Sequence, residues 1–346
     1  MDNLQTTKIN QVNRRHLFYL ILFALGFFLL LPHLIGIQRT LEMIRRADPR
    51  LILLALSAET LRNILSASST VLLARMFARR VPLFAMTEAF FASGALNRTF
   101  STGGAPGIIL RLLFLTRLGV AGGSVAAIFL IENLAGFLVG GIVFLFGVAA
   151  LAATQTLDGA AGNFSRIFVS GLLLIILAII ILYRRRALID RTIFGIALRL
   201  NAAAQKFFRH PIVKLSQVRR GLEDFYAGLA LARTRPRVFA VIVLINLLRN
   251  ASGYAALYFS FLALGSPASL PALILFYTAG SVLSSLSAVP GEVLLVGTGM
   301  AILSLSFGIP RDLALIAILL SRTVTFWFPL PVGYAALWHL HRQKYL

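Results

Sequence analysis

Residues 119–150 read GVAGGSVAAIFLIENLAGFLVGGIVFLFGVAA and contain a single ionisable side chain, that of Glu132. A helix needs about 20 predominantly apolar residues to cross the hydrocarbon core of a bilayer. The stretch exceeds this length and contains no Pro that would break a helix. It therefore predicts a membrane-spanning helix, and the rest of the chain can be divided by the same criterion.

Five further segments are long and apolar enough to span a membrane. They are residues 17–37, 51–74, 166–183, 238–264 and 312–338. With 58% hydrophobic residues, 13% charged residues and a mean hydropathy of +0.86, the composition lies outside the range of soluble domains. We predict an all-α polytopic membrane protein with about six spanning helices, in which residues 1–346 form a single membrane domain.

The order of features along the chain occurs twice. ETLRNILSAS (59–68) and NLLRNASGYA (246–255) both carry an Arg-Asn pair inside a predicted span. Each is followed by an apolar stretch that Gly and Pro interrupt, and then by a span that carries a charge. We therefore predict two repeats, residues 17–150 and 166–338. Because each repeat contains three spans, the second enters the membrane upside down, as in inverted-repeat transporters.

The interrupted stretches, about 83–118 and 270–308, predict two re-entrant helical hairpins that open to opposite sides of the membrane. Their turns would fall in STGGAPG (101–107) and SAVPGE (287–292). The residues expected at these turns are Gly103, Gly104, Pro106, Gly107, Pro290 and Gly291. The alternative is a kinked but complete helix in each place, which Gly and Pro also produce in membranes.

The positive charge of the chain predicts its orientation. The sequence holds 33 Lys and Arg residues against 12 Asp and Glu residues, a formal net charge of +21. With both termini in the cytoplasm, most of the basic residues fall on the cytoplasmic side, as the positive-inside rule requires. This pattern predicts a multi-pass protein of the bacterial inner (cytoplasmic) membrane. We expect no nucleic-acid partner, because topology and the anionic leaflet account for the charge.

Residues 184–237 form the one long polar segment. Its apolar residues recur at helical spacing, with a break at His210-Pro211. We predict a basic cytoplasmic segment of two amphipathic helices that lie on the inner leaflet.

Several kinds of chemistry are excluded by the residues present. Cysteine is absent, and the five His residues show no metal-ligand spacing. No Walker A pattern occurs, so this chain would not bind ATP through that motif. We therefore expect no metal, no cofactor and no catalysis of covalent chemistry.

Ionisable residues inside the apolar segments are the candidate functional residues. Each costs about 2.5–3.5 kcal/mol at the centre of a spanning helix, so they are expected to have a role. An Arg side chain offers five donors in a planar fork that matches phosphate oxygens. The candidates for substrate binding and translocation are Glu59, Arg62, Arg98, Arg111, Glu132, Arg249, Glu292 and Arg322.

Purely structural roles are the alternative for some of these residues. Glu59 and Arg62 lie three residues apart on one helix face and can neutralise each other. Arg98 and Arg249 have no such local partner and must find a carboxylate on another helix, a carbonyl group or a ligand.

For three other candidates the role is also open. Glu132 and Glu292 would receive an ammonium headgroup, relay protons or pair with the buried arginines. Arg111 would either bind a ligand or snorkel to the inner headgroup boundary.

The stretch from VPLFAMTEAFFASGALNRTFSTGGAPGIILRLLFLTRLG (81–119) to IENLAGFLVG (131–140) resembles the membrane region of lysylphosphatidylglycerol synthases. This flippase-like family also occurs as stand-alone proteins. Its pattern of a Pro/Gly turn, an Arg and then a Glu in the next helix corresponds here to Pro106-Gly107, Arg111 and Glu132.

The second half of the chain continues the resemblance with one departure. VPGEV (289–293) and the Arg-containing final span LSRTVTFWFPLPVG (320–333) match the family. The family's second turn usually reads PGGxGxxE, whereas Gly297 stands here where the acidic residue would fall. Glu292 is the residue that would compensate, unless the substrate differs.

The resemblance implies a function in lipid movement. In the fused enzymes this membrane region is expected to carry aminoacylated phosphatidylglycerol to the outer leaflet, while a separate soluble domain makes the lipid. We therefore expect a flippase-like transporter that moves a phospholipid or glycolipid headgroup without ATP hydrolysis. Its expected partners are membrane lipids, anionic or aminoacylated, and a separate lipid synthase. Whether the chain forms a homo-oligomer stays open. The alternatives are a secondary transporter of a soluble anion and a non-transporting membrane subunit of envelope assembly.

Overall fold

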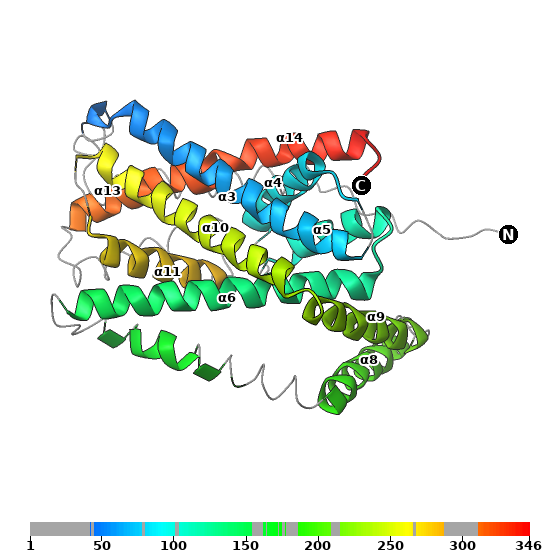
Figure 1. Ribbon diagram of the computed structural model, residues 1–346. Coiled ribbons are helices and arrows are strands. Elements are labelled where there is room, and N and C mark those ends of the chain that lie inside the picture. The colour runs from blue at the N-terminus through cyan, green and yellow to red at the C-terminus, as the bar shows by residue number, and fades with distance from the viewer. Residues whose placement is uncertain are drawn as a thin grey trace.

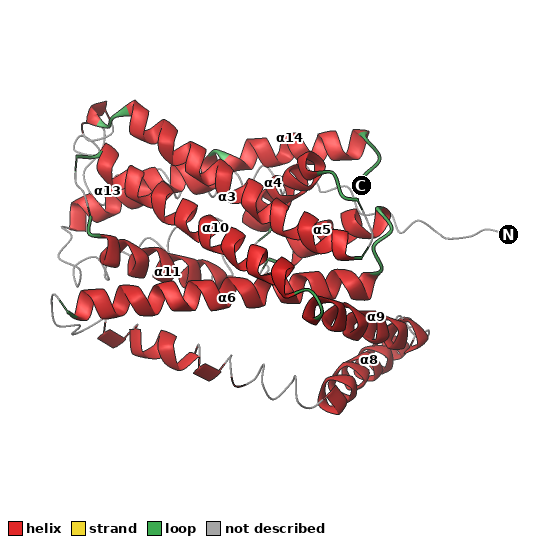
Figure 2. Cartoon of the chain, viewed as in Figure 1, coloured by secondary structure: helices red, strands yellow, loops and turns green. Residues whose placement is uncertain are grey.

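The computed structural model describes residues 42, 45–77, 80–100, 104–153, 162–163, 165–171, 173–174, 177, 186–208, 215–265, 268–286 and 311–346. All regular structure within these ranges is helical (Figure 2). The predicted first span, 17–37, and residues 287–308 of the predicted second hairpin lie outside the described residues. The predicted span 166–183 is described only in part.

Three described helices are long and apolar enough to cross a membrane. They are α3 (Pro49–Met76), α6 (Gly122–Ala152) and α10 (Pro236–Ala263). They coincide with three of the spans predicted from hydropathy, so the expectation of an all-α membrane protein is confirmed. Their starts follow from local chemistry, because α3 and α10 each have Pro in the first turn, and the Asp48 side chain accepts a hydrogen bond from Arg50 N at 2.8 Å.

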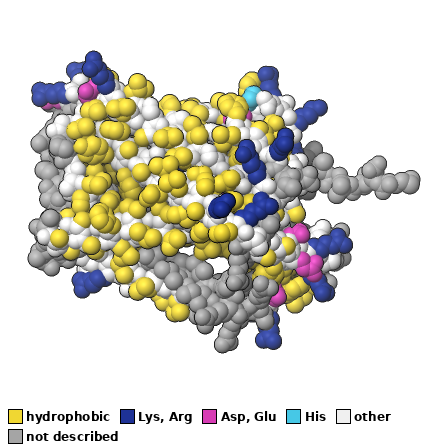
Figure 3. Space-filling view, viewed as in Figure 1, with side chains coloured by type: hydrophobic (Ala, Val, Ile, Leu, Met, Phe, Trp, Pro, Cys, Tyr) yellow, Lys and Arg dark blue, Asp and Glu magenta, His cyan; other side chains and the backbone are white. Residues whose placement is uncertain are grey.

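The long helices pack along one another, and α3 runs opposite to both α6 and α10. In Figure 1, α3 runs from the left end of the bundle to the right, and α10 packs along it in the opposite direction. The outward faces are apolar: on α6, Ile142 is 59% exposed and Phe146 is 66% exposed. Figure 3 shows one such face, with hydrophobic side chains between two ends at which Lys and Arg gather. This distribution fits a helical bundle that is surrounded by lipid.

Helices α4 (Leu83–Thr99) and α5 (Ala105–Arg117) form a helical hairpin. In Figure 1 the hairpin starts and ends at the right end of the bundle, where α3 ends and α6 begins. With 17 and 13 residues, the two helices are about 26 Å and 20 Å long, shorter than the hydrocarbon core of about 30 Å. A re-entrant hairpin requires such short arms, and its position in the bilayer stays a prediction.

The α4–α5 turn depends on two of the glycines expected there. Gly104 has a φ of 82°, in the left-handed region that favours glycine, and Pro106 follows in the first turn of α5. Gly107 donates its backbone N–H to Asn97 Oδ1 at 2.7 Å, and a Cβ atom there would lie 2.6 Å from Asn97 Nδ2. Glycine therefore lets α5 approach α4 closely. Gly103 lies outside the described residues.

Helix α11 (Leu270–Leu286) is the described arm of the predicted second hairpin. It starts at the left end of the bundle in Figure 1, opposite the end at which α4 starts, and it packs against α6. Phe144 of α6 and Phe276 of α11 are fully buried in the same apolar cluster. The residues expected at its turn, Pro290 and Gly291, lie outside the described residues, as does Glu292. The inverted repeat accordingly stays a prediction.

The basic segment contains α8 (Arg186–Phe208) and α9 (Leu215–Arg233). Tyr226 of α9 donates a hydrogen bond to Asp190 Oδ1 of α8 at 2.8 Å, and α9 packs against α6. Their position relative to a membrane surface stays a prediction.

The last predicted span, 312–338, differs from a regular α-helix. It consists of α13 (Arg311–Arg322), a π-helical segment (Thr323–Trp327) and α14 (Pro329–Arg342). Pro329 has no N–H to give to the carbonyl group of Thr325 four residues earlier. Phe328 N instead bonds to Thr323 O at 3.0 Å, which is the i to i+5 spacing of a π-helix.

The hairpin can be tested by side-specific labelling, because the natural chain contains no Cys. We expect single cysteines in Arg80→Cys, Arg117→Cys and Gln343→Cys to react with a membrane-impermeant maleimide from the same side. Arg50→Cys, at the far end of α3, should react from the opposite side. Ala105→Cys, at the turn between α4 and α5, should not react from the side of Arg50→Cys; reaction from that side would show that α4 and α5 both cross the membrane.

Candidate functional site

A cavity of about 480 Å³ lies between the helices of both predicted repeats. Four arginines from four helices line it, together with one carboxylate. These residues are Arg62 of α3, Arg98 of α4, Arg111 of α5, Arg249 of α10 and Glu132 of α6. Most of the remaining lining side chains are Asn and Ser. The cavity is therefore polar although the outer faces of the same helices are apolar.

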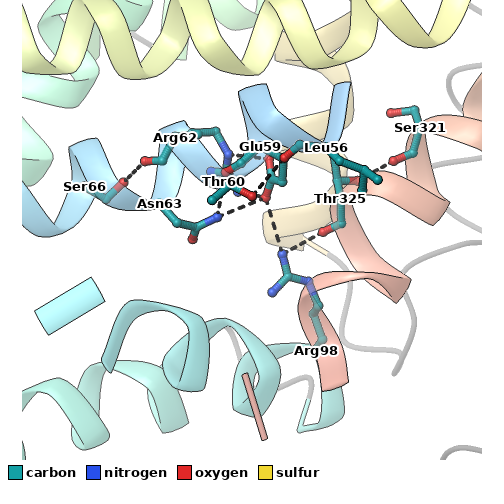
Figure 4. Close-up of polar contacts among 9 residues, drawn as sticks. All are labelled: Leu56, Glu59, Thr60, Arg62, Asn63, Ser66, Arg98, Ser321 and Thr325. Carbon is teal, nitrogen blue, oxygen red and sulfur yellow. Dashed lines mark hydrogen bonds and ion pairs between the residues drawn. The ribbon is translucent and has the colours of Figure 1, made fainter. Parts of the chain in front are cut away.

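The carboxylate of Glu59 organises one side of this cavity. Its side chain is 1% exposed and accepts two hydrogen bonds from Arg62, from Nε at 2.7 Å and from Nη2 at 2.6 Å. Asn63 donates from Nδ2 to the Glu59 backbone carbonyl at 2.9 Å (Figure 4). The predicted pairing of Glu59 with Arg62 is thus present, and Arg62 also faces the cavity.

Arg98 connects α4 to α3 and to the π-helical segment. Its Nη2 lies 4.0 Å from Glu59 Oε1 and donates to the backbone oxygen of Thr325 at 2.7 Å (Figure 4). This is the carbonyl group for which Pro329 provides no donor. Arg98 therefore meets both a carboxylate and a carbonyl group on other helices.

Arg111 and Glu132 form a second ion pair across the cavity. Arg111 Nη1 lies 3.8 Å from Glu132 Oε2, and Thr70 of α3 donates a hydrogen bond to Glu132 Oε1. The guanidinium carbon lies 4.6 Å from the ring centre of Phe90 and 4.8 Å from that of Phe129. Such cation–π contacts fix the orientation of the guanidinium. Arg111 is only 18% exposed and lines the cavity, and its role as a ligand-binding or an interfacial residue stays a prediction.

Arg249 lies against Gly136 of α6. A Cβ atom at Gly136 would be 2.9 Å from Arg249 Nη2, so glycine makes room for the guanidinium. Arg249 makes no hydrogen bond and no ion pair with the described residues. The N–H donors of its guanidinium group are therefore available to a ligand.

The two Arg-Asn pairs that define the predicted repeat meet at this site. Arg62 and Asn63 reach the cavity from α3, and Arg249 and Asn250 reach it from the antiparallel helix α10. Corresponding positions of the two predicted repeats therefore contribute to one cavity.

The charges at the site favour an anion. Four guanidinium groups meet two described carboxylates, those of Glu59 and Glu132, and both carboxylates are already engaged by Arg side chains. Phosphate and carboxylate groups are the ligands that arginine forks bind best. No group of His, Asp and Glu residues that could hold a metal occurs in the described part of the chain.

The other predicted site residues are not among the described residues that line the cavity. Arg322 lies at the end of α13. Glu292 falls outside the described residues. Gly104, Pro106 and Gly107 shape the α4–α5 turn beside the cavity rather than an independent site.

Several contributors were not anticipated from the sequence. They are Thr70, Thr325, Phe90 and Phe129, which hold Glu132, Arg98 and Arg111 in place. Only Pro329 gave a usable signal, because a proline in a helix leaves a carbonyl group four residues earlier in need of a donor.

The contacts of Arg98 predict a stability effect. We expect Arg98→Gln to lower the free energy of unfolding in detergent by about 1–3 kcal/mol, because the carbonyl group of Thr325 loses a charged donor. The control is Arg219→Gln, which removes an ion pair between side chains that are 78% and 66% exposed and should cost at most about 1 kcal/mol. Equal losses in both variants, measured by thermal and denaturant unfolding, would contradict the role assigned to Arg98.

Comparison with known families identifies one match. The family model described as lysylphosphatidylglycerol synthase TM region matches residues 17–333, nearly the whole chain. Among curated proteins, no sequence match was found.

Proposed function

Because the chain belongs to the lysylphosphatidylglycerol synthase TM region family, we propose that it is a flippase-like lipid transporter. It moves a phospholipid or glycolipid headgroup between the leaflets, without ATP hydrolysis by this chain and without covalent chemistry. The observation that carries the proposal is the arginine-lined cavity inside a bundle whose outer faces are apolar.

The physical problem in lipid transfer is the polar headgroup. A charged group moved through hydrocarbon loses its hydration at a cost of many kcal/mol unless other groups replace the water. Arg98, Arg249 and the neighbouring Asn and Ser side chains would replace it inside the cavity. The acyl chains can remain in the bilayer against the apolar outer faces of the helices. The cavity is thus suited to the headgroup and the exterior to the tails.

We further propose that the two halves form an inverted repeat that opens the cavity alternately to each leaflet. Support comes from the antiparallel packing of α3 and α10 and from the opposite ends at which α4 and α11 start. In such folds one half rocks against the other around a fixed central site. The hydrogen bond from Arg98 to Thr325 crosses the boundary between the halves and would have to rearrange during this motion.

The proposed location is the bacterial inner (cytoplasmic) membrane with the C-terminus in the cytoplasm. Support comes from the basic residues at one end of the bundle, which include Arg75 in the last turn of α3, Arg117 in the last turn of α5 and Arg342 in the last turn of α14. The amphipathic helices α8 and α9 add to the charge of the same end (Figure 1).

Reconstitution tests the function directly. In proteoliposomes that contain headgroup-labelled lipids, we expect the wild type to accelerate leaflet exchange and Arg249→Ala to slow it about tenfold or more. The reason is the loss of a charge-assisted contact to the phosphate, worth about 1.5–3 kcal/mol. Arg219→Ala, on the exposed face of α9, should exchange lipids at the wild-type rate.

Three other results would each favour a different function. Equal exchange in empty and protein-containing vesicles would refute the flippase. Saturable uptake of a soluble anion without lipid exchange would favour the secondary-transporter alternative. Retained lipid phenotypes in cells after Arg249→Ala, but not after deletion of α8 and α9, would favour a non-transporting subunit.

Glycine 136 provides a second, independent probe of Arg249. We expect Gly136→Ala to slow exchange severalfold, because the new Cβ atom would lie 2.9 Å from Arg249 Nη2 and displace it. Gly140→Ala, one turn further along α6, meets no atom within 4 Å and should leave the rate unchanged. Equal rates for both variants would show that the position of Arg249 does not matter.

A further inference from the structure

The cavity contains a polar atom that nothing in the described protein satisfies. Ser69 of α3 is 4% exposed and lines the cavity, yet its hydroxyl group has no hydrogen-bond partner in the described protein. Beside Arg249, Asn246 Oδ1 is likewise without a partner, and this side chain is 1% exposed. Buried polar atoms in folded proteins are almost always hydrogen-bonded, so each unpaired one calls for an explanation. A ligand that carries hydroxyl groups would supply the missing partner of Ser69.

Three asparagines of the cavity wall share one orientation. Asn63, Asn133 and Asn250 each donate through Nδ2 to a backbone carbonyl four residues earlier, at 2.9, 2.7 and 2.9 Å. One N–H of each Nδ2 is thereby committed to the helix, which fixes the orientation of the amide, and the amide oxygen remains as an acceptor that a ligand can use. The wall therefore combines guanidinium donors for a phosphate with amide oxygens for hydroxyl groups.

An ammonium group could also donate to these oxygens, but the charge of the cavity opposes it. Four guanidinium groups line the wall, and a cation among them would be repelled. The one carboxylate among the described lining residues, Glu132, already accepts from Thr70 and faces Arg111 at 3.8 Å. The described wall thus favours an anionic ligand over a zwitterionic or cationic one.

We infer that the cavity selects a phosphate ester of a polyol, an anionic headgroup with free hydroxyl groups, over headgroups that carry an amine. The inference rests on the proposed lipid transport and specifies its substrate class. Arg249 binds the phosphate, while Ser69 and the amide oxygens of Asn63, Asn133 and Asn250 bind the hydroxyl groups. Amine-bearing headgroups, including aminoacylated ones, are disfavoured.

Competition between lipids tests this selectivity. Vesicles would contain phosphatidylglycerol, phosphatidylethanolamine or lysylphosphatidylglycerol. Exposure of the glycerol diol would be followed with impermeant periodate, and exposure of amines with an impermeant amine reagent. We expect phosphatidylglycerol to exchange at least about tenfold faster than the two amine-bearing lipids. Faster exchange of either amine-bearing lipid would overturn the inference and leave the proposed transport standing.

Ser69→Ala separates hydroxyl recognition from structural damage. The variant should slow phosphatidylglycerol exchange about threefold to tenfold and leave phosphatidylethanolamine exchange unchanged. Ser57→Ala, an exposed position on the same helix, is the matched control and should change neither rate. An equal loss for all lipids in Ser69→Ala would show a structural role and contradict the inference.

Two measurements distinguish failure of the inference from failure of lipid transport. In thermal unfolding in detergent, phosphatidylglycerol should stabilise the wild type more than phosphatidylethanolamine does. This difference between the two lipids should be smaller in Ser69→Ala. Absence of the difference would overturn the inference whatever the transport result. Uptake of glycerol 3-phosphate into vesicles that exchange no lipid would refute lipid transport and retain the polyol phosphate as the ligand.

Discussion

The buried carboxylate of Glu59 is the contact on which the geometry of the site depends. It receives both arms of the Arg62 guanidinium and lies 4.0 Å from that of Arg98, which belongs to another helix. Without this carboxylate, the two guanidinium groups would lack the negative charge that lies between them. Because Arg98 also bonds to Thr325, one acidic side chain links α3, α4 and the π-helical segment. The position of the cavity follows from that link.

The second requirement is that backbone groups be satisfied at membrane depth. Spanning segments must pair every N–H and carbonyl group within the protein, because lipid offers no partner. At Pro329 the helix cannot meet this requirement by itself, and the side chain of Arg98 completes it. At the α4–α5 turn, Asn97 accepts from the backbone of Gly107 for the same reason. In both places an irregular backbone lies beside the cavity, where polar side chains are available.

Local patterns in the sequence predicted the local features of the structure. Hydropathy identified α3, α6 and α10, the Gly and Pro residues identified the α4–α5 turn, and three-residue spacing identified the Glu59–Arg62 pair. Contacts between distant helices could not be predicted in this way, since the partners of Arg98 lie on α3 and beyond α13. For the same reason, the room that Gly136 makes for Arg249 could not be predicted from the sequence. The π-helical segment was missed because Pro329 also permits an ordinary kink.

The π-helical segment Thr323–Trp327 also sets the rotational register of the last helix. A π-helical turn holds about one residue more than an α-helical turn, and one residue corresponds to about 100° of rotation. If this segment returned to α-helical hydrogen bonding, α14 would turn about its own axis relative to α13 by roughly that angle. The faces of α14 that meet α4, including the bond between Tyr334 and Thr99, would then point elsewhere. A change of a single backbone hydrogen-bond register would thereby turn an entire helix beside the hairpin.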